Sequence, residues 1–307
     1  MAQGKTGTGL ALIVLGLAFS QGSLAQGGGV DAITQLTENV YRRGPTSNVF
    51  LVTDEGIVMV DATCEGRGME WLKQELNERF GVPVKYTILS HDHESHICDL
   101  DVFDDTAVSI GHRNIRPHIV REGRNTSIPR IVFDDYLEIH LGGQRVHLYY
   151  FGPSHSDNLI QVHFPDEGVL VATDLVRAGR SIVLPDYRDS NVNSLIDVLW
   201  HASKLDNVDI VVPGHGDLAD QQSFLYFREY LIALRDRVLE EMIAGATIEQ
   251  ILERVTMEDY SDYGNYDRWF RANVISMWDN LYRYREPSEG LDEYQNSYPI
   301  GFPIGPH

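Results

Sequence analysis

The chain has 307 residues, 43% of them hydrophobic, which is enough to bury the core of one sizeable α/β domain. Its 45 acidic residues outnumber its 25 basic ones and give a formal net charge of −20. This acidity argues against nucleic acid as a partner, because proteins bind phosphate backbones mainly through Lys and Arg.

The first 25 residues have the pattern of a secretory signal peptide. Lys5 precedes an apolar segment at residues 10–19, and Ser23-Leu24-Ala25 supplies small residues before the expected cleavage site. The apolar segment is about half as long as the roughly 20 residues that a membrane span requires. We therefore expect a periplasmic or secreted protein that begins near Gln26 and has no membrane contact after cleavage.

Strands and helices alternate along the next part of the chain, as in an α/β protein. Residues 48–53 and 56–60 predict a β-hairpin, and the spacing of Met69, Leu72 and Leu76 before Gly81 predicts a helix with a glycine cap. Residues 84–90 predict a strand. Further strands are expected at residues 107–110, 130–133, 136–141, 144–151, 159–164 and 168–173.

After residue 220 the pattern changes to helix. Apolar residues from Phe224 to Met242 and from Phe270 to Leu281 recur at intervals of three and four, which is typical of amphipathic helices. The tail at residues 286–307 has no periodicity, so we expect an extended segment. The predicted organisation is one domain at residues 26–285, with a core at about 35–220 and C-terminal helices at 221–285.

Three histidines, His91, His93 and His96, lie within six residues directly after the apolar run at residues 86–89. Neutral imidazole is a common zinc ligand, and a loop leaving a strand can aim alternate side chains at one point. The alternative is a polar loop that is rich in histidine without a metal. Further candidate ligands downstream favour the metal site.

Three more candidates each follow an apolar run. His155 comes after the run at residues 145–151, Asp174 comes directly after the run at residues 168–173, and His215 follows Val211 and Val212. Strand ends that meet at one edge of an α/β body are a usual place for a site. The sequence therefore predicts a metal centre built from four strand ends.

This pattern resembles the metallo-β-lactamase fold superfamily, whose motif is His-x-His-x-Asp-His followed by a distant His, a bridging Asp and a final His. The resemblance covers residues 35–220 and implies a four-layer αβ/βα sandwich, here with extra C-terminal helices. It also implies the ligands: His91, His93 and His155 for the first metal, His96 and His215 for the second, and Asp174 as a bridge. Asp61, at the end of residues 56–60, matches an acidic residue beneath the site that orients a ligand imidazole.

Ser95 departs from the motif, because the family has an aspartate ligand for the second metal at this position. A serine oxygen stays neutral near pH 7, so two cations would face one carboxylate, Asp174, instead of two. We expect one tightly bound zinc and a weaker second site. Asp174 and Ser95 are the predicted catalytic residues beside the ligands, Ser95 through a hydrogen bond to water.

The resemblance implies a secreted hydrolase of small molecules that cleaves an ester, lactone, thioester or amide, with a β-lactam among the candidates. Zinc lowers the pKa of bound water to about 7, so a hydroxide nucleophile exists at neutral pH. One alternative is a redox enzyme of the same fold with a single iron, which would tolerate loss of a second-site ligand. Another is a metal-binding protein with weak catalysis.

Several residues are candidates on position alone. His112 and Tyr187 are predicted substrate contacts, as are Arg177 and Arg180, because they lie in segments that follow predicted strands. Cys64 and Cys98 both lie near the expected metal edge. They either form a disulfide in an oxidising compartment or are two small buried residues.

Overall fold

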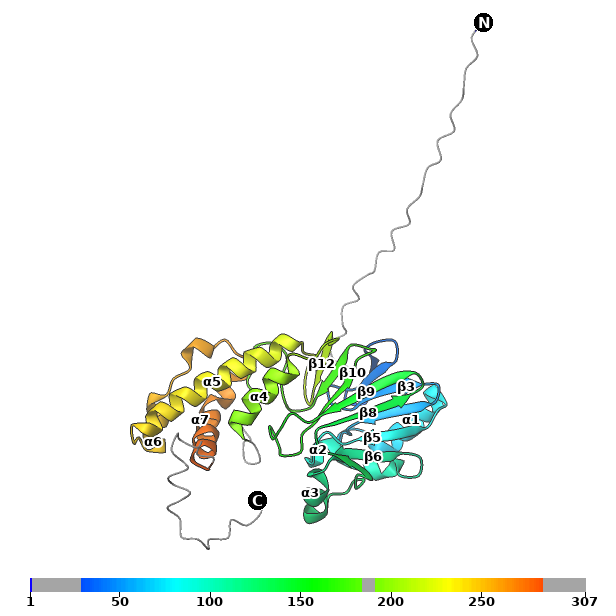
Figure 1. Cartoon of the computed structure of the whole chain (residues 1–307), viewed down its shortest axis with the longest axis horizontal. Helices are drawn as coiled ribbons and strands as arrows, with labels where there is room; N and C mark the ends of the chain where they lie inside the picture. The colour runs from blue at the N-terminus through cyan, green and yellow to red at the C-terminus, as the bar shows by residue number, and fades with distance from the viewer. Residues whose placement is uncertain (2–28, 184–190, 284–307) are drawn as a thin grey trace.

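The structure is a computed structural model that describes Met1, residues 29–183 and residues 191–283. The predicted signal peptide, Tyr187 and the predicted tail lie outside the described residues, apart from Met1. In the described part the chain forms two β-sheets and seven α-helices (Figure 1). None of the described helices is both long and apolar enough to cross a membrane.

The first sheet has seven strands in chain order. They are β1 Ile33–Gln35, β2 Val40–Arg43, β3 Val49–Thr53, β4 Gly56–Val60, β5 Val84–Ile88, β6 Val108–His112 and β7 Ile131–Phe133. Strands β1 to β4 pair antiparallel, and β4 to β7 pair parallel. The carboxyl ends of β4, β5 and β6 therefore meet at one edge of the sheet.

The second sheet has five strands in the order β12-β11-β10-β9-β8. They are β8 Tyr136–Leu141, β9 Gln144–Tyr149, β10 Gln161–Phe164, β11 Val169–Ala172 and β12 Ile210–Pro213. The β8–β9 hairpin turns at Gly142 and Gly143, and both have positive φ angles, 54° and 78°. A two-residue turn with positive φ at both positions suits glycine, as the sequence predicts.

Three apolar clusters hold four layers together. Alternate residues of both sheets, such as Leu51 and Leu148, meet in the cluster between the sheets. On the far side of the first sheet, Met59 packs with residues of α1 Gly68–Phe80 and α3 Ile115–Glu122. On the far side of the second sheet, Leu170 packs with α4 Val192–Ala202 and α5 Gln221–Ile243. This helix–sheet–sheet–helix order confirms the predicted four-layer αβ/βα fold.

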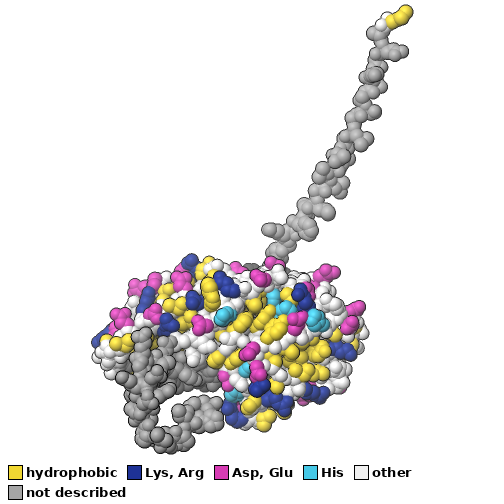
Figure 2. Space-filling view, viewed as in Figure 1, with side chains coloured by type: hydrophobic (Ala, Val, Ile, Leu, Met, Phe, Trp, Pro, Cys, Tyr) yellow, Lys and Arg dark blue, Asp and Glu magenta, His cyan; other side chains and the backbone are white. Residues whose placement is uncertain are grey.

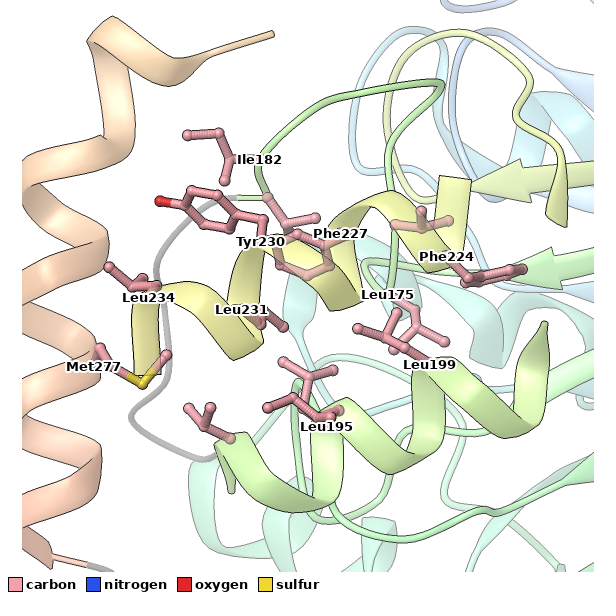
Figure 3. Close-up of a cluster of buried hydrophobic side chains, with 14 of the residues drawn as sticks. Leu175, Ile182, Leu195, Leu199, Phe224, Phe227, Tyr230, Leu231, Leu234 and Met277 are labelled. Atoms are coloured by element: carbon pink, nitrogen blue, oxygen red, sulfur yellow. The ribbon is translucent and has the colours of Figure 1, made fainter. Parts of the chain in front are cut away.

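The C-terminal helices lie at one end of the molecule beside the second sheet (Figure 1). After α5 come α6 Ile248–Arg254 and α7 Tyr266–Arg283. Leu199 of α4, Phe227 and Leu231 of α5, and Met277 of α7 belong to one buried cluster (Figure 3). Each such side chain stabilises the fold by roughly 1.5–3 kcal/mol when it leaves water, so this end of the protein is firmly attached to the sheet.

The outer face of β8 and β9 is less covered than the rest of the second sheet. Tyr136 is 47% exposed, and the side chain of His140 is 69% exposed. Figure 2 shows histidine and apolar side chains together on this side, with acidic and basic groups interspersed over the visible surface. The excess negative charge is therefore spread over this view and does not form one large acidic patch.

Most predicted elements are present. Several strands are shorter than predicted, β4 and β8 have the predicted bounds, and β6 ends two residues later than predicted. The sequence patterns do not predict β1, β2, α3, α4, α6 or the one-turn helix α2 Glu94–Ile97. In α3 only Ile115 and Ile119 are buried, so its apolar stripe is too short for a periodic signal. In α4 the signal is local: the side chain of Asn191 caps the helix by accepting hydrogen bonds from the N–H groups of Asn193 and Ser194.

Candidate metal centre

The six predicted ligands come from four different loops that meet at one edge of the two sheets. His91 and His93 follow β5, and His96 lies in α2 Glu94–Ile97. His155 lies between β9 and β10, Asp174 follows β11, and His215 follows β12. The structure therefore brings together all six residues singled out from the sequence.

Four of these residues form the first group. One ligand atom from each of His91, His93, His155 and Asp174 lies within 4.8 Å of the others. His155 Nε2 is 2.9 Å from His93 Nδ1 and 3.6 Å from Asp174 Oδ2. His91 Nε2 is 3.9 Å from the same carboxylate oxygen.

The second group shares Asp174 with the first. His96, Asp174 and His215 again lie within 4.8 Å of one another. His96 Nε2 is 3.1 Å from Asp174 Oδ2, and His215 Nε2 is 3.6 Å from Asp174 Oδ1. Because both groups converge on one carboxylate, Asp174 has the position of a bridging ligand.

These donors fit a tetrahedral cation. Two ligand atoms at 2.0–2.1 Å from one zinc ion lie roughly 3.3–3.4 Å apart, which falls within the spread of distances above. His91 is fully buried, and its Nε2 has no hydrogen-bond partner in the described structure. A buried imidazole nitrogen without a partner is costly, and a bound cation would satisfy it.

The charges of the site also suit a cation. Burial is the main cause that holds the pKa of His91 well below its usual value, and the neighbouring histidines add to the effect. Burial opposes ionisation of Asp174, but the histidines, above all His96, hold its pKa well below the usual range. Burial therefore favours neutral imidazole at His91, and Asp174 is held ionised; a cation bound at the site would replace the favourable charge that His96 supplies to Asp174, whose carboxylate raises the pKa of His96.

Asp61 lies beneath the first group and is fully buried. Its Oδ1 accepts a hydrogen bond from the Ser90 N–H, and its Oδ2 accepts from the hydroxyls of Ser90 and Thr173, each at 2.8 Å. Burial raises the pKa of Asp61, while the charge of His96 and these hydrogen bonds oppose the rise. Asp61 and Asp174 both have positive φ angles, 54° and 53°, which are uncommon for residues other than glycine and recur at functional sites.

Ser95 lies on α2 between two predicted ligands and is exposed. It lines a cavity of about 500 Å³ together with His93 and polar side chains of α3, among them His118 and Arg121. Of the six candidate ligands, His93 lines this cavity. The catalytic role predicted for Ser95 stays a prediction.

The other candidate contacts are placed differently. His112 ends β6, is only 4% exposed and stacks on Tyr150 with ring centroids 3.7 Å apart. Its predicted contact with substrate has no support in this packing. Arg180 forms an ion pair with Asp262 on the surface, at 3.3 Å, and is not among the residues of either metal group.

Arg177 does lie beside the metal cluster. A Cβ added to Gly216, next to His215, would lie 3.6 Å from Arg177 Nη1. The guanidinium also lies over the ring of Trp269 in α7, 5.1 Å from its centroid. From the sequence, Trp269 belongs to an aromatic stretch that could line a substrate pocket or a dimer interface but more often forms an ordinary buried helix face.

Cys64 and Cys98 form a disulfide with their Cα atoms 5.7 Å apart. The structure therefore selects a disulfide over two unpaired, buried cysteines. Cys98 lies two residues after His96, and Cys64 lies three residues after Asp61. The bond therefore ties the loop after β4 to the loop that carries three of the candidate ligands.

Comparisons with known proteins agree with this arrangement. A family model described as the metallo-beta-lactamase superfamily matches residues 42–215. A metallo-beta-lactamase type 2 of Bacillus cereus is 24% identical over 214 residues, which cover 66% of this chain and 83% of the relative. The 2,4-dinitroanisole O-demethylase subunit alpha of Nocardioides sp. is 24% identical over 276 residues, which cover 85% of this chain and 79% of the relative.

A solved structure extends the comparison to the fold. The stereoselective inverting sec-alkylsulfatase from Pseudomonas sp. superposes with a TM-score of 0.66 at 15% identity, over 88% of this chain and 52% of that one. The family match spans more than half of this chain and contains all six candidate ligands, from His91 to His215. The chain therefore belongs to the metallo-beta-lactamase superfamily of metal-dependent hydrolases.

Proposed function

We propose that this protein is an exported zinc hydrolase that cleaves an ester, lactone, thioester or amide bond in a small molecule. The observation that carries the proposal is the first group, in which three imidazoles and one carboxylate converge around the partnerless Nε2 of His91. Zinc bound there would lower the pKa of a water molecule to about 7 and supply a nucleophile at neutral pH.

Other residues of the site supply charge to the metal groups and define the side from which a substrate enters. Asp174 supplies negative charge to both groups, and its side chain is only 16% exposed, which limits the screening of that charge by water. The side chain of His215 is 52% exposed, whereas those of His91 and His96 are buried, so the second group is open to solvent on the side of His215. We propose that a substrate enters from the side of His215 and Ser95.

Arg177 supports a substrate with an anionic group close to the bond that is cleaved. Its side chain has no ion pair with any described carboxylate and lies near enough to Asp174 for that charge to affect its pKa. Burial lowers the pKa of Arg177, and nearby Arg268 lowers it further. A dication in the second group would repel Arg177, and a carboxylate, sulfate or phosphate group on the substrate would relieve that repulsion.

The comparisons suggest two candidate substrate classes. The relative from Bacillus cereus is a beta-lactamase, and a β-lactam carries both an amide and a carboxylate. The demethylase subunit and the alkylsulfatase match larger shares of this chain, 85% and 88%, which must include part of α5–α7. Because α7 contributes Trp269 beside Arg177, we favour a non-lactam ester with an anionic group and keep a β-lactam as the second candidate.

Export is part of the same proposal. The disulfide between Cys64 and Cys98 suits an oxidising compartment such as the periplasm, in agreement with the signal-peptide pattern. The net charge of −20 supports a small-molecule substrate over nucleic acid. We propose no membrane partner for the protein after the leader is removed.

The test compares metal-stripped protein with the same protein reloaded with zinc. The panel contains a chromogenic cephalosporin, a lactone, a thioester, and two matched aryl esters with and without a carboxylate. We expect reloading to raise hydrolysis at least about 100-fold, because one group that stabilises transition-state charge is typically worth 10²–10³. His155→Ala should abolish the gain, and His140→Ala, an exposed histidine away from the site, should not.

Other outcomes point to the alternatives. Turnover that requires iron and oxygen would identify a redox enzyme of this fold. Bound zinc with no hydrolysis of any panel member would favour a metal-binding protein. A preference for the carboxylate-bearing ester that Arg177→Gln removes, through a KM increase of about 10-fold or more, would support the anionic substrate.

A further inference from the structure

The first turn of α7 carries an indole ring that two arginines share. Trp269 of this turn is 7% exposed. The Cζ atom of Arg177 lies over its ring, 5.1 Å from the centroid, and the Cζ atom of Arg268 lies 5.2 Å from the centroid. The two guanidinium groups are therefore at most about 10 Å apart, although one comes from the loop after β11 and the other from α7.

Backbone contacts hold the loop after β11 against the segment that begins α7. An isolated parallel β-bridge joins Ser181 to Gly264. The Ile182 N–H donates to the carbonyl oxygen of Gly264 at 3.0 Å, and the Gly264 N–H donates to the carbonyl oxygen of Arg180 at 2.8 Å. The side-chain amide of Asn265 adds a hydrogen bond to the Ser181 hydroxyl at 3.1 Å. The loop and the start of α7 therefore form one unit.

This unit adjoins the metal groups through Arg177. A Cβ added to Gly216, the residue after the ligand His215, would lie 3.6 Å from Arg177 Nη1. Arg177 is partly buried, whereas Arg268 is exposed. Arg177 is therefore the inner cation, beside the metal groups, and Arg268 is the outer cation, on the same indole.

Neither guanidinium has a carboxylate partner in the part of the chain that the structure describes. Arg180, in the same loop as Arg177, does pair with Asp262. The indole face stabilises the charge of a cation that lies over it, and this contact leaves the N–H groups of a guanidinium available. Arg177 and Arg268 can therefore each donate two hydrogen bonds to an oxyanion.

We infer that Arg177 and Arg268 form a two-point anion site on Trp269, which selects substrates that carry two anionic groups. The inference rests on the proposed function and narrows its substrate class. Arg177 binds the anionic group near the bond that is cleaved, and Arg268 binds a second one farther from the metals. Trp269 is a positioning residue that holds both guanidinium groups, so the C-terminal helices form part of the active site.

The first experiment needs neither zinc nor turnover. Calorimetric titration of the metal-free protein at low ionic strength compares adipate with hexanoate, which lacks the second carboxylate. We expect adipate to bind at least about tenfold more tightly, because a hydrogen bond to a charged group is typically worth this much. Arg268→Gln should remove the difference, and Arg177→Gln should weaken both probes. Adipate that binds no more tightly than hexanoate would overturn the two-point site, whether or not the protein hydrolyses an ester.

The second experiment uses zinc-loaded protein and two aryl esters, one with a single carboxylate and one with two. Arg268→Gln should raise the KM for the dianionic ester at least about tenfold and leave its kcat within about threefold, because the second anion binds equally in the ground and transition states. The KM for the monoanionic ester should stay within about threefold. Arg271→Gln is the matched control, because it removes the same charge from an exposed position three residues further along α7. An equal effect of this control would show that charge alone, and not position on Trp269, sets the KM.

The positioning role of Trp269 is tested by two substitutions. Trp269→Phe keeps an aromatic face, whereas Trp269→Leu removes it and should raise the KM for the dianionic ester at least about threefold with little change in kcat. An unchanged KM in Trp269→Leu, in a protein that thermal unfolding shows to be folded, would contradict this role. If Trp269→Leu does not fold, a KM in Trp269→Phe between those of the wild type and Arg268→Gln supports the role, and a KM that equals or exceeds that of Arg268→Gln contradicts it.

Failure of the proposed function has a different result. A wild type that hydrolyses neither ester after zinc loading would count against the hydrolase. The titration of metal-free protein with adipate and hexanoate would still decide whether Arg177 and Arg268 bind two anionic groups.

Discussion

Removing the disulfide tests how the metal loop is held in place. The substitution Cys64→Ser is suitable because Cys64 is exposed and serine replaces its sulfur without leaving a cavity. The bond joins residues separated by 34 positions, and the enclosed segment contains α1, β5 and the three histidines of the loop. Its loss leaves the packing of these elements intact and acts mainly on the unfolded chain.

The magnitude follows from the length of the closed loop. In the chain-entropy model a bond that closes a loop of this size lowers the free energy of the native state relative to the unfolded chain by about 4 kcal/mol at 25 °C. The native loop keeps other contacts, such as the hydrogen bond from the Ala62 N–H to the carbonyl oxygen of His96 at 2.6 Å. We therefore expect Cys64→Ser to fold with the same secondary structure and reduced stability.

The assay is urea unfolding of metal-free protein, followed by circular dichroism and tryptophan fluorescence. We expect the free energy of unfolding to fall by about 3–4 kcal/mol in Cys64→Ser. The wild type treated with a reducing phosphine should match the variant, and the variant should not respond to the phosphine. A difference below about 1 kcal/mol, or a wild type that does not respond to reduction, would refute the reasoning.

Three further predictions concern the site and its surroundings. Ser95→Asp should raise the affinity for the second zinc equivalent at least about tenfold and increase hydrolysis, because it adds a negative charge beside a dication. The control is Ser95→Asn, which adds the same volume and no charge. Equal effects of the two substitutions would contradict the charge argument. Gly214→Ala should lower zinc affinity at least about tenfold in a protein that still folds, because the new Cβ would lie 2.0 Å from Asp174 Oδ1 and displace this carboxylate. A zinc titration that matches the wild type would show that the carboxylate does not need this space. Asp31→Asn should lower the free energy of unfolding by about 1–3 kcal/mol near neutral pH, because it leaves the fully buried Arg43 without its carboxylate partner at 2.6 Å. The hydrogen bond from Arg43 holds the pKa of Asp31 below its usual value, so this contribution is complete above about pH 5 and is lost as pH falls through the lowered pKa. Wild type and variant should therefore converge in acid unfolding curves below about pH 4, and a constant difference down to pH 2 would be inconsistent with the pair.

Local patterns in the sequence are sufficient for much of the fold. The hairpin at residues 48–60, the glycine turn at Gly142 and Gly143, and the long helix after residue 220 depend on the conformational preferences of neighbouring residues. The same holds for the candidate ligands, because each follows an apolar run that becomes a strand. Residues that follow neighbouring strands lie at the same edge of the sheets, and this placement does not depend on how the core side chains pack.

Other features have a weaker signal in the sequence. The short helices α2, α3 and α6 bury too few residues for a periodic pattern, although local caps mark the starts of α4, at Asn191, and of α6, at Thr247. His112 follows an apolar run like the ligands, yet it stacks on Tyr150 away from the metal groups. Position after a strand therefore identifies candidates, and the packing of the neighbouring strands selects among them.

The amino-acid sequence by itself determined the six candidate ligands, the family and the layered fold, because these depend on residue type and local spacing. The tertiary structure decided the pairing of Cys64 with Cys98 and the contact of Arg177 with Trp269. It also decided which hydroxyls surround Asp61, among them that of Thr173, 112 residues away. Such contacts join segments that are distant in the chain, so they exist only once the two sheets pack face to face and bring their strand ends together.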